Sequence, residues 1–387
     1  MTFRLLQWVF VQNSGLLPEA ASLLVPGRRA LTPVIGALCA TGVIWAVQRW
    51  SSAGPSVEYV EAVRFDDGRI PFASTLWRTI SSAFSVATGA AIGREGSMIQ
   101  FAAAVTSWIG ARSPLKSVPL LRQVAYGTAA AVAAAYQAPV AGVFFVLEIV
   151  LGEWIWRELP QLALASVAGW LVSRLILSAG PLFVVHSAFS PSTNALWTLP
   201  LAILLGVCGP MYQKLLRSAR FASRWPLALV WGGLAVGLLS LSRTTVWGNG
   251  ELALMNILKG NQALSSVALV LGLRLIATTL CVGTGTVGGV FTPTLFVGAA
   301  IGLTSAQLLH STAPLLLAVV GLSTLLAAVT HAPFMAASMA VELTGQYHLA
   351  PWLLLLNLLA SLIARKISPH SLYAIATPTP MDTASIA

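Results

Sequence analysis

The stretch that decides the fold occurs twice, as GTAAAVAAAYQAPVAGVFFVLE at residues 127–148 and as GLSTLLAAVTHAPFMAASMAVE at residues 321–342. Aligned at an offset of 194, both copies carry Ala-Pro in the middle and a glutamate nine residues beyond the proline. A proline inside an apolar stretch ends or kinks a helix. The sequence therefore predicts an internal repeat, with a helix broken at the same place in each half.

The composition around these copies is that of a membrane protein. Of the 387 residues, 57% are hydrophobic and only 9% are charged, where an average soluble domain has about 25% charged residues. The mean hydropathy is +0.81, which excludes an ordinary soluble enzyme and predicts an all-α polytopic membrane protein. The net charge of +10 comes from Lys and Arg scattered between apolar stretches. This pattern is typical of membrane-helix flanks, so we expect a lipid bilayer and no nucleic acid as partner.

The longest segment without Asp, Glu, Lys or Arg is 275–341, and glycines and prolines interrupt it. Irregular backbone at membrane depth occurs only where protein buries it or where it lines a cavity, so broken helices indicate an internal pathway. We expect one transmembrane ion-transport domain over 1–387, with repeat one at about 30–180, repeat two at about 225–375 and no cytosolic regulatory domain. Two broken-helix halves that face one midplane site favour inverted repeats.

Glu95 is a charge inside the membrane, since apolar segments flank Ala91-Ile92-Gly93-Arg94-Glu95-Gly96-Ser97. Carboxylates at this depth are costly and usually functional. The glycines allow backbone to approach an ion closely, and a helix start attracts anions through free N–H groups and its dipole. A carboxylate beside such donors can occupy the place of the anion and leave it when protonated. We predict that Glu95 is a gate; the alternative is a structural ion pair between Arg94 and Glu95.

A second candidate helix start, Gly288-Gly289-Val290-Phe291-Thr292-Pro293, aligns with the Glu95 segment at an offset of 196. Proline suits an early helical position and glycine the preceding turn. The segment therefore predicts a second anion-facing helix start, or, taken alone, only a helix break.

Four further residues stand out. Glu148 and Glu342 follow Ala-Pro at equal distance, and we expect both to hydrogen-bond buried backbone. Ser52 lies in a segment with the chemistry of a helix cap, where its hydroxyl could donate to an anion or belong to an ordinary loop. Tyr373 is a candidate ligand or an interfacial aromatic residue.

The sequence predicts no cofactor, no metal site and no catalytic residue. The cysteines, Cys39, Cys208 and Cys281, are far apart, and the five histidines have no metal-ligand spacing. An intramembrane enzyme is a remote alternative that would need a nucleophile or a metal cluster, and neither G-x-S-x-G nor H-E-x-x-H occurs. A membrane scaffold would leave the cost of Glu95 unexplained.

These pieces together resemble the CLC family of chloride channels and chloride/proton exchangers, over nearly the whole chain. Gly93-Arg94-Glu95-Gly96 resembles the family's G-R-E-G-P motif, and Gly289–Pro293 resembles G-x-F-x-P. Ser52–Pro55 resembles a divergent G-S-G-I-P, and Tyr373 falls where the family's central tyrosine lies. Trp247–Gly250 further resembles a bacterial branch of the family.

The resemblance implies a chloride ion held by the hydroxyls of Ser52 and Tyr373 and by the N–H groups of Val290 and Phe291. Glu95 would be the gate, and backbone around Arg94 to Gly96 would hold a second anion once Glu95 moves away. The family implies two inverted repeats per subunit, a homodimer with one pore in each protomer, and a multi-pass protein of the cell inner membrane. Chloride and similar small anions would be its cargo.

Two departures from the family's pattern affect the predicted function. Ser97 stands where the motif has proline, and Ile149 stands where exchangers carry their inner proton glutamate. Isoleucine has no donor or acceptor for a proton, so we expect a pH- and voltage-gated chloride channel. The alternative is a chloride/proton antiporter with a water path around Ile149. A fluoride-selective relative is disfavoured because Ser52 and Tyr373 are retained.

Overall fold

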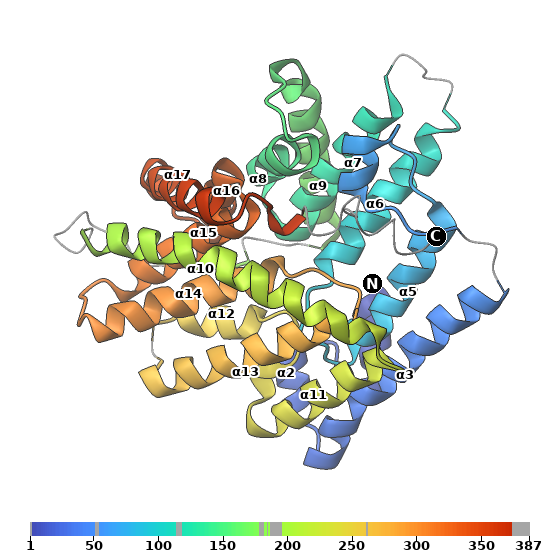
Figure 1. The fold of residues 1–387 in the computed structure, drawn as a ribbon, viewed down its shortest axis with the longest axis horizontal. Helices are drawn as coiled ribbons and strands as arrows, with labels where there is room; N and C mark the ends of the chain where they lie inside the picture. Colours follow the sequence, from blue (N-terminus) through green and yellow to red (C-terminus); the bar gives the residue numbers. More distant parts are fainter. Residues whose placement is uncertain are drawn as a thin grey trace.

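The computed structural model describes residues 2–50, 54–113, 118–177, 182, 183, 185, 196–260 and 262–373. Within these ranges the regular elements are helices, and the one extended pairing is an isolated bridge. Figure 1 shows α5, α6 and α7 on one side and α14 to α17 on the other. The α-helices are α1 (Thr2–Val11), α2 (Leu17–Ser22), α3 (Pro26–Trp50), α4 (Tyr59–Phe65), α5 (Phe72–Ala87), α6 (Glu95–Gly110), α7 (Leu120–Tyr136), α8 (Pro139–Phe145), α9 (Leu159–Leu177), α10 (Thr198–Ser218), α11 (Ala228–Ser242), α12 (Glu251–Leu258), α13 (Leu264–Gly283), α14 (Phe291–Leu308), α15 (Pro314–Thr330), α16 (Pro333–Thr344) and α17 (Ala350–Ile367).

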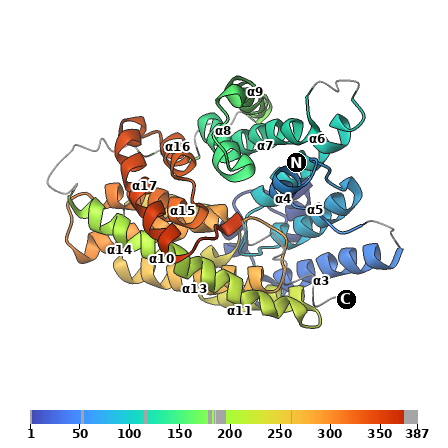
Figure 2. The same cartoon turned by 45° about the horizontal axis from the view of Figure 1, so that its top comes forward.

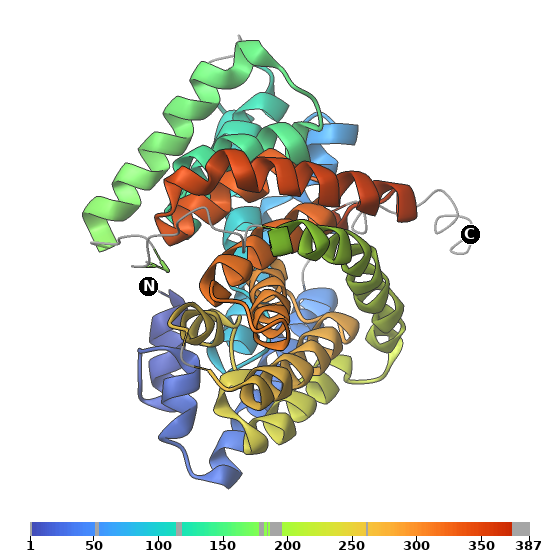
Figure 3. The ribbon, with the colours of Figure 1, turned by 90° about the vertical axis from the view of Figure 1, so that its left-hand side faces the viewer.

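Six helical segments among the described residues are long and apolar enough to cross a membrane. The buried fraction of these segments shows which of them lie at the centre of the molecule and which lie at its periphery. In the most apolar window of α14, 72% of the residues are buried, whereas the corresponding share for the segment that contains α9 is 11%. Figure 3 shows α9, the long green helix, at the top edge of the molecule, far from the dark blue first helices at the bottom. α9 therefore leaves apolar side chains exposed on the surface of the subunit, while α14 lies inside the protein.

The two halves of the chain repeat one helix order. α6 begins at residue 95 and α14 at residue 291, which is 196 positions later. α7 and α8 begin at residues 120 and 139, and α15 and α16 begin 194 positions later, at residues 314 and 333. These offsets agree with those of the sequence repeat, so the predicted all-helical fold with two repeats and a broken helix in each is confirmed.

The break between α7 and α8 has the same local cause as the break between α15 and α16. Each first helix ends at a residue in the left-handed conformation, Gln137 with φ 56° or His331 with φ 59°. An alanine with a non-helical backbone conformation follows, and Pro139 or Pro333 then starts the next helix. Proline lacks an N–H and cannot continue the preceding helix, but its fixed φ suits the first position of a new one.

Two glutamates join the halves reciprocally. The carboxylate of Glu342 accepts the N–H groups of Val140 and Ala141 at the start of α8, at 2.9 and 2.8 Å. The carboxylate of Glu148 accepts the N–H groups of Phe334 and Met335 at the start of α16, at 3.3 and 2.7 Å. α8 and α16 pack against each other there (Figure 2). The structure thus confirms that both glutamates hydrogen-bond backbone of the opposite half, at groups that are buried or partly buried.

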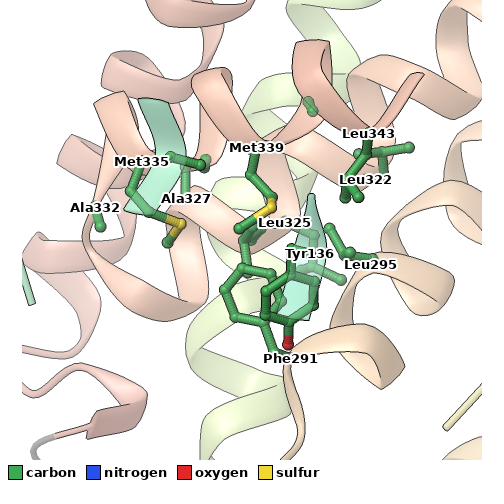
Figure 4. Packing of buried hydrophobic residues seen from close by; sticks show 14 of the residues in the cluster. Tyr136, Phe291, Leu295, Leu322, Leu325, Ala327, Ala332, Met335, Met339 and Leu343 are labelled. Carbon is green, nitrogen blue, oxygen red and sulfur yellow. The ribbon is translucent and has the colours of Figure 1, made fainter. Parts of the chain in front are cut away.

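The main core lies between α14, α15 and α16 and reaches across to α7. Leu295, Leu322 and Leu325 are buried there, together with Met335 and Met339 (Figure 4). Tyr136, the last residue of α7, lies against Phe291, the first residue of α14, with ring centroids 4.9 Å apart. This packing fixes the start of α14 relative to the first half of the chain.

Candidate functional site

The two repeats meet at a pair of glycines. The N–H of Gly93 donates to the carbonyl of Gly289 and the N–H of Gly289 donates to the carbonyl of Gly93, both at 2.7 Å. This antiparallel bridge joins residues that are equivalent in the repeat alignment, since 289 − 93 = 196. α6 and α14 each begin two residues beyond the bridge, so two helix N-termini start from one point inside the protein.

Glycines are required there because the two backbones touch. A Cβ atom on Gly96 would lie 2.8 Å from both the Cα and the nitrogen of Gly289. A Cβ atom on Gly289 would lie 2.9 Å from the nitrogen of Gly96. We expected these glycines to let backbone approach an ion, and in the structure they also let the repeats approach each other. Any larger residue would force the two helix starts apart.

The first N–H groups of α6 and α14 have no partner within their own helices, as at every helix N-terminus. Aligned peptide dipoles add a partial positive charge at each end. These are the groups that the sequence assigned to anion binding, the backbone near Glu95 and Gly96 in one half and near Val290 and Phe291 in the other. A small anion between the two helix starts would receive donors from both.

Glu95 is the first residue of α6, and its side chain is 8% exposed. The side-chain amide of Asn249 donates to its Oε1 at 2.8 Å. Its Oε2 is buried without a hydrogen-bond partner among the described residues. No ion pair within the described part of the chain joins Arg94 to Glu95. The carboxylate is therefore held by one amide and not neutralised by a neighbouring cation.

A cavity of about 400 Å³ lies on one side of the bridge. Its walls include Gly96 and Ser97 of α6, Val290 and Phe291 at the start of α14, and Tyr373. Three arginines also line it, Arg78, Arg217 and Arg220, against one carboxylate, that of Glu58. Arg78 forms an ion pair with Glu58 at 3.1 Å. The excess of positive charge favours the entry of anions.

Tyrosines converge on this cavity from three parts of the chain. Tyr59 is the first residue of α4, Tyr136 is the last residue of α7, and Tyr373 follows α17. Tyr59, Tyr136 and Tyr373 all line the cavity. The Tyr373 ring packs edge-on against Phe145, with centroids 5.6 Å apart. The cavity wall thus carries hydroxyl groups beside the helix N-termini.

A second cavity of about 430 Å³ lies beyond Glu95. Ile92 and Arg94 line it, together with Asn249, Glu251 and the connection between α1 and α2. Because Arg94 lines this cavity and Gly96 lines the first one, Glu95 lies between the two. Glu95, which is buried, therefore lies at the boundary between two hollow regions of the protein.

The structure brings together most of the residues that the sequence singled out. Gly96, Val290, Phe291 and Tyr373 share the first cavity, while Arg94 lines the second one. Ser52 lies outside the described residues. Ile149 is 3% exposed in a π-helical turn at Val146–Leu151 and lines neither cavity.

Sequence reasoning missed three contributors. Tyr136 and Asn249 act through contacts with residues far away in the sequence, and no spacing pattern shows such contacts. Arg274 was detectable, because it is a lone charge in the apolar stretch 264–283 and the rule that selected Glu95 applies to it as well. In the structure its side chain is fully enclosed, with 1% exposed.

Comparisons with known proteins agree with this geometry. The family model described as "Voltage gated chloride channel" matches residues 36–365. The "Voltage-gated ClC-type chloride channel ClcB" of Shigella flexneri is 38% identical over an alignment 388 positions long, which covers 95% of this chain and 92% of that protein. The protein of the same name from Escherichia coli strain SMS-3-5 has the same identity and coverage.

Two solved structures share the fold. A slow cyanobacterial Cl⁻/H⁺ antiporter superposes with a TM-score of 0.82 at 22% identity, covering 96% of this chain and 92% of that one. A CLC-type fluoride/proton antiporter superposes with a TM-score of 0.78 at 20% identity, covering 97% and 95%. At these identities the likeness extends to the fold alone. The family match over most of the chain, together with the ClcB relatives, shows that this protein belongs to the voltage-gated chloride channel (CLC) family, in its ClcB-like branch.

Proposed function

We propose that this protein conducts chloride passively across the cell inner membrane, through a pore that Glu95 gates. The observation that carries the proposal is the position of Glu95, a buried carboxylate between two cavities at the meeting point of two helix N-termini. A carboxylate in that position closes the path between the cavities. An anion that replaces it would meet the same N–H donors.

The proposed chloride-binding groups are neutral donors. They are the N–H groups of Val290 and Phe291, the hydroxyl of Tyr373 and that of Ser52, with backbone near Gly96 for a second ion. Donors of this kind bind an anion without a full positive charge, so the ion can also leave. The arginines that line the first cavity would raise the local concentration of anions.

Passive conduction is favoured over proton exchange by the surroundings of residue 149. The Ile149 side chain is apolar and buried, and its carbonyl accepts a hydrogen bond from Arg64 at 2.6 Å. The neighbouring carboxylate, that of Glu148, already accepts two backbone N–H groups of α16. Neither side chain is available to carry protons toward Glu95. The ClcB relatives, which are named channels, support the same choice.

A chloride/proton antiporter is the second candidate, because both solved relatives described above are named antiporters. In that case water would have to carry protons past Ile149. The reversal potential distinguishes the two functions. We expect purified protein in liposomes to give a reversal potential that follows the chloride gradient and does not move when only a proton gradient is imposed. Uphill proton movement driven by chloride alone would overturn passive conduction.

We further propose that residues 1–387 form one multi-pass transmembrane domain and that two copies form a homodimer with a pore in each protomer. The exposed apolar surface of helices such as α9 suits contacts with lipid and with a second copy. No cofactor is part of the proposal, since the donors described above suffice to bind an anion.

A further inference from the structure

We propose that Asn249 is a latch that holds the charged carboxylate of Glu95 in the closed position and thereby sets the pH at which the pore opens. The inference rests on the proposed gating role of Glu95 and assigns a positioning residue to it. Its starting point is the 2.8 Å hydrogen bond from the Asn249 amide to Oε1 of Glu95. The two residues are 154 positions apart and belong to different repeats.

The Asn249 side chain is oriented from both ends. Its amide donates to Glu95, while its Oδ1 accepts the N–H of Glu251 at 3.1 Å, at the start of α12. The flanking residues, Gly248 and Gly250, have φ angles of 74° and 101°, in the left-handed region that glycine adopts readily. The backbone thus makes a tight turn that presents the amide to the gate.

A buried arginine holds this turn in place. The guanidinium of Arg274 in α13 donates to the carbonyls of Thr245 at 2.6 Å, Val246 at 3.2 Å and Gly248 at 2.9 Å. Three carbonyl groups of one short loop therefore accept hydrogen bonds from the same guanidinium group. Since charge-assisted hydrogen bonds are the stronger ones, Arg274 fixes the loop that carries Asn249.

The loop is also seated on the first repeat. Trp247 is fully buried and packs on Gly89, where a Cβ atom would come within 2.5 Å of its ring. The N–H of Gly248 donates to the carbonyl of Gly89 at 3.2 Å. Gly89 belongs to the connection between α5 and α6 that ends at Glu95. The backbones that carry Glu95 and Asn249 are thus parts of one packed unit, so only the Glu95 side chain has to move when the gate opens.

No other charged or titratable group described around Glu95 takes the place of the hydrogen bond from Asn249. Arg94 precedes it in the chain without an ion pair to it, and Glu251 of α12 repels it. Tyr136 of α7 also interacts with it electrostatically, and Arg4 of α1 acts on Glu251. A donor that bonds the ionised carboxylate favours the charged form. Asn249 therefore favours the closed, charged gate, and losing the donor lets the gate open at higher pH.

The test is the pH profile of chloride flux in liposomes, measured for Asn249→Ala and Asn249→Asp. Asn249→Ala removes the amide donor without adding a charge, and we expect the midpoint of acid activation to move up by about one pH unit. Asn249→Asp keeps an oxygen for the N–H of Glu251 and so keeps the start of α12. Its carboxyl group also repels Glu95 or shares a proton with it, so its midpoint should move up further than that of Asn249→Ala. A wild-type midpoint in Asn249→Ala would overturn the latch.

The background variant Glu95→Gln separates the two proposals. If Glu95 is the gate, Glu95→Gln loses its pH dependence, and adding Asn249→Ala to it changes the profile no further. A flat profile in Glu95→Gln combined with a wild-type midpoint in Asn249→Ala would overturn the latch and leave the gate standing. An unchanged pH dependence in Glu95→Gln would overturn both.

Discussion

The two repeats meet at the crossing of α8 and α16 and at the glycine bridge, and these two places differ in the symmetry of their side chains. At the crossing of α8 and α16, both halves carry a glutamate, and Glu148 and Glu342 make the same pair of hydrogen bonds in opposite directions. At the glycine bridge, the backbones are equivalent but the first helical residues are not, because α6 begins with Glu95 and α14 begins with Phe291. The side chains at the crossing of α8 and α16 therefore follow the two-fold symmetry of the repeats, and the side chains at the glycine bridge do not.

This difference teaches where to look for structure and where to look for function. A residue that occurs in both halves stabilises the contact between them, because the helix start in each half needs the same hydrogen-bond acceptor. A residue that occurs in only one half is a candidate for a role in function, because the symmetric contact does not need it. Glu95 thus acts on the pathway, while Phe291 at the equivalent place packs against Tyr136 and offers its backbone N–H.

The largest effect is expected at the symmetric crossing. Replacing Glu342 or Glu148 by Ala leaves two N–H groups at a helix start of the opposite half, buried or partly buried, without an acceptor. At about 1–3 kcal/mol for each group, either variant should lose about 2–6 kcal/mol of unfolding free energy. Thermal or denaturant unfolding in detergent would measure it. The exposed Glu153→Ala is the control, and a loss in only one of the two core variants would show that the crossing is not symmetric in energy.

At the asymmetric crossing the effect should fall on flux and not on stability. Glu95→Gln resembles the protonated gate. A charge-assisted contact that holds the Glu95 carboxylate in the closed position contributes ~1.4 kcal/mol, so its loss should raise chloride flux at neutral pH about tenfold. Acid should activate it little further. Flux assays in liposomes between pH 4.5 and 7.5 measure this, with Glu153→Gln as control. Flux that responds to acid as strongly as in the wild type would remove Glu95 from the gate.

A smaller effect is expected at the cavity wall. Tyr373→Phe removes one hydroxyl that we propose as a chloride donor, which corresponds to about 1 kcal/mol or roughly a fivefold weaker affinity. Chloride titration by calorimetry, or the chloride-to-nitrate ratio in flux, would show it. Tyr347→Phe, at a site that is 63% exposed, should have no effect. Ser52→Ala is the parallel experiment, and wild-type behaviour of both variants would place the anion elsewhere.

The smallest effect is expected at residue 149. In Ile149→Glu, a new buried carboxylate would be mostly neutral, and it could accept a proton only where water reaches it. We expect weak proton movement at most, with the reversal potential close to that of the wild type. Ile149→Gln has a similar shape without a titratable group and is the matched control. Tight chloride/proton coupling in Ile149→Glu alone would reveal a proton route that lacks only this residue.

Local signals in the sequence were sufficient to predict the repeat, the helix breaks and the segment around Glu95. The Ala-Pro pairs fixed the starts of α8 and α16, and the two offsets, 196 and 194, agree with the starts of the paired helices. Glu148 and Glu342 could be assigned because the repeat itself showed their equivalence. The Glu95 segment was recognisable because a charge among apolar residues is costly.

What escaped the sequence is the set of contacts between segments that are distant along the chain. Nothing around Asn249 shows that its amide reaches Glu95, since the approach depends on Arg274 gathering the loop and on Trp247 resting on Gly89. The closeness of Gly96 and Gly289 likewise follows from how the halves cross. Each of these features needs the relative placement of both repeats, and a repeat alignment gives only their equivalence.

The most direct test of the central claim, that the Glu95 carboxylate and chloride compete for one set of donors, is calorimetric chloride binding to the purified protein as a function of pH. Protonation removes the competing carboxylate, so chloride affinity should rise as the pH falls, and binding should take up protons from the buffer. In Glu95→Gln, affinity should be high and independent of pH, with no proton uptake. The same pH dependence and proton uptake in both proteins would contradict the claim.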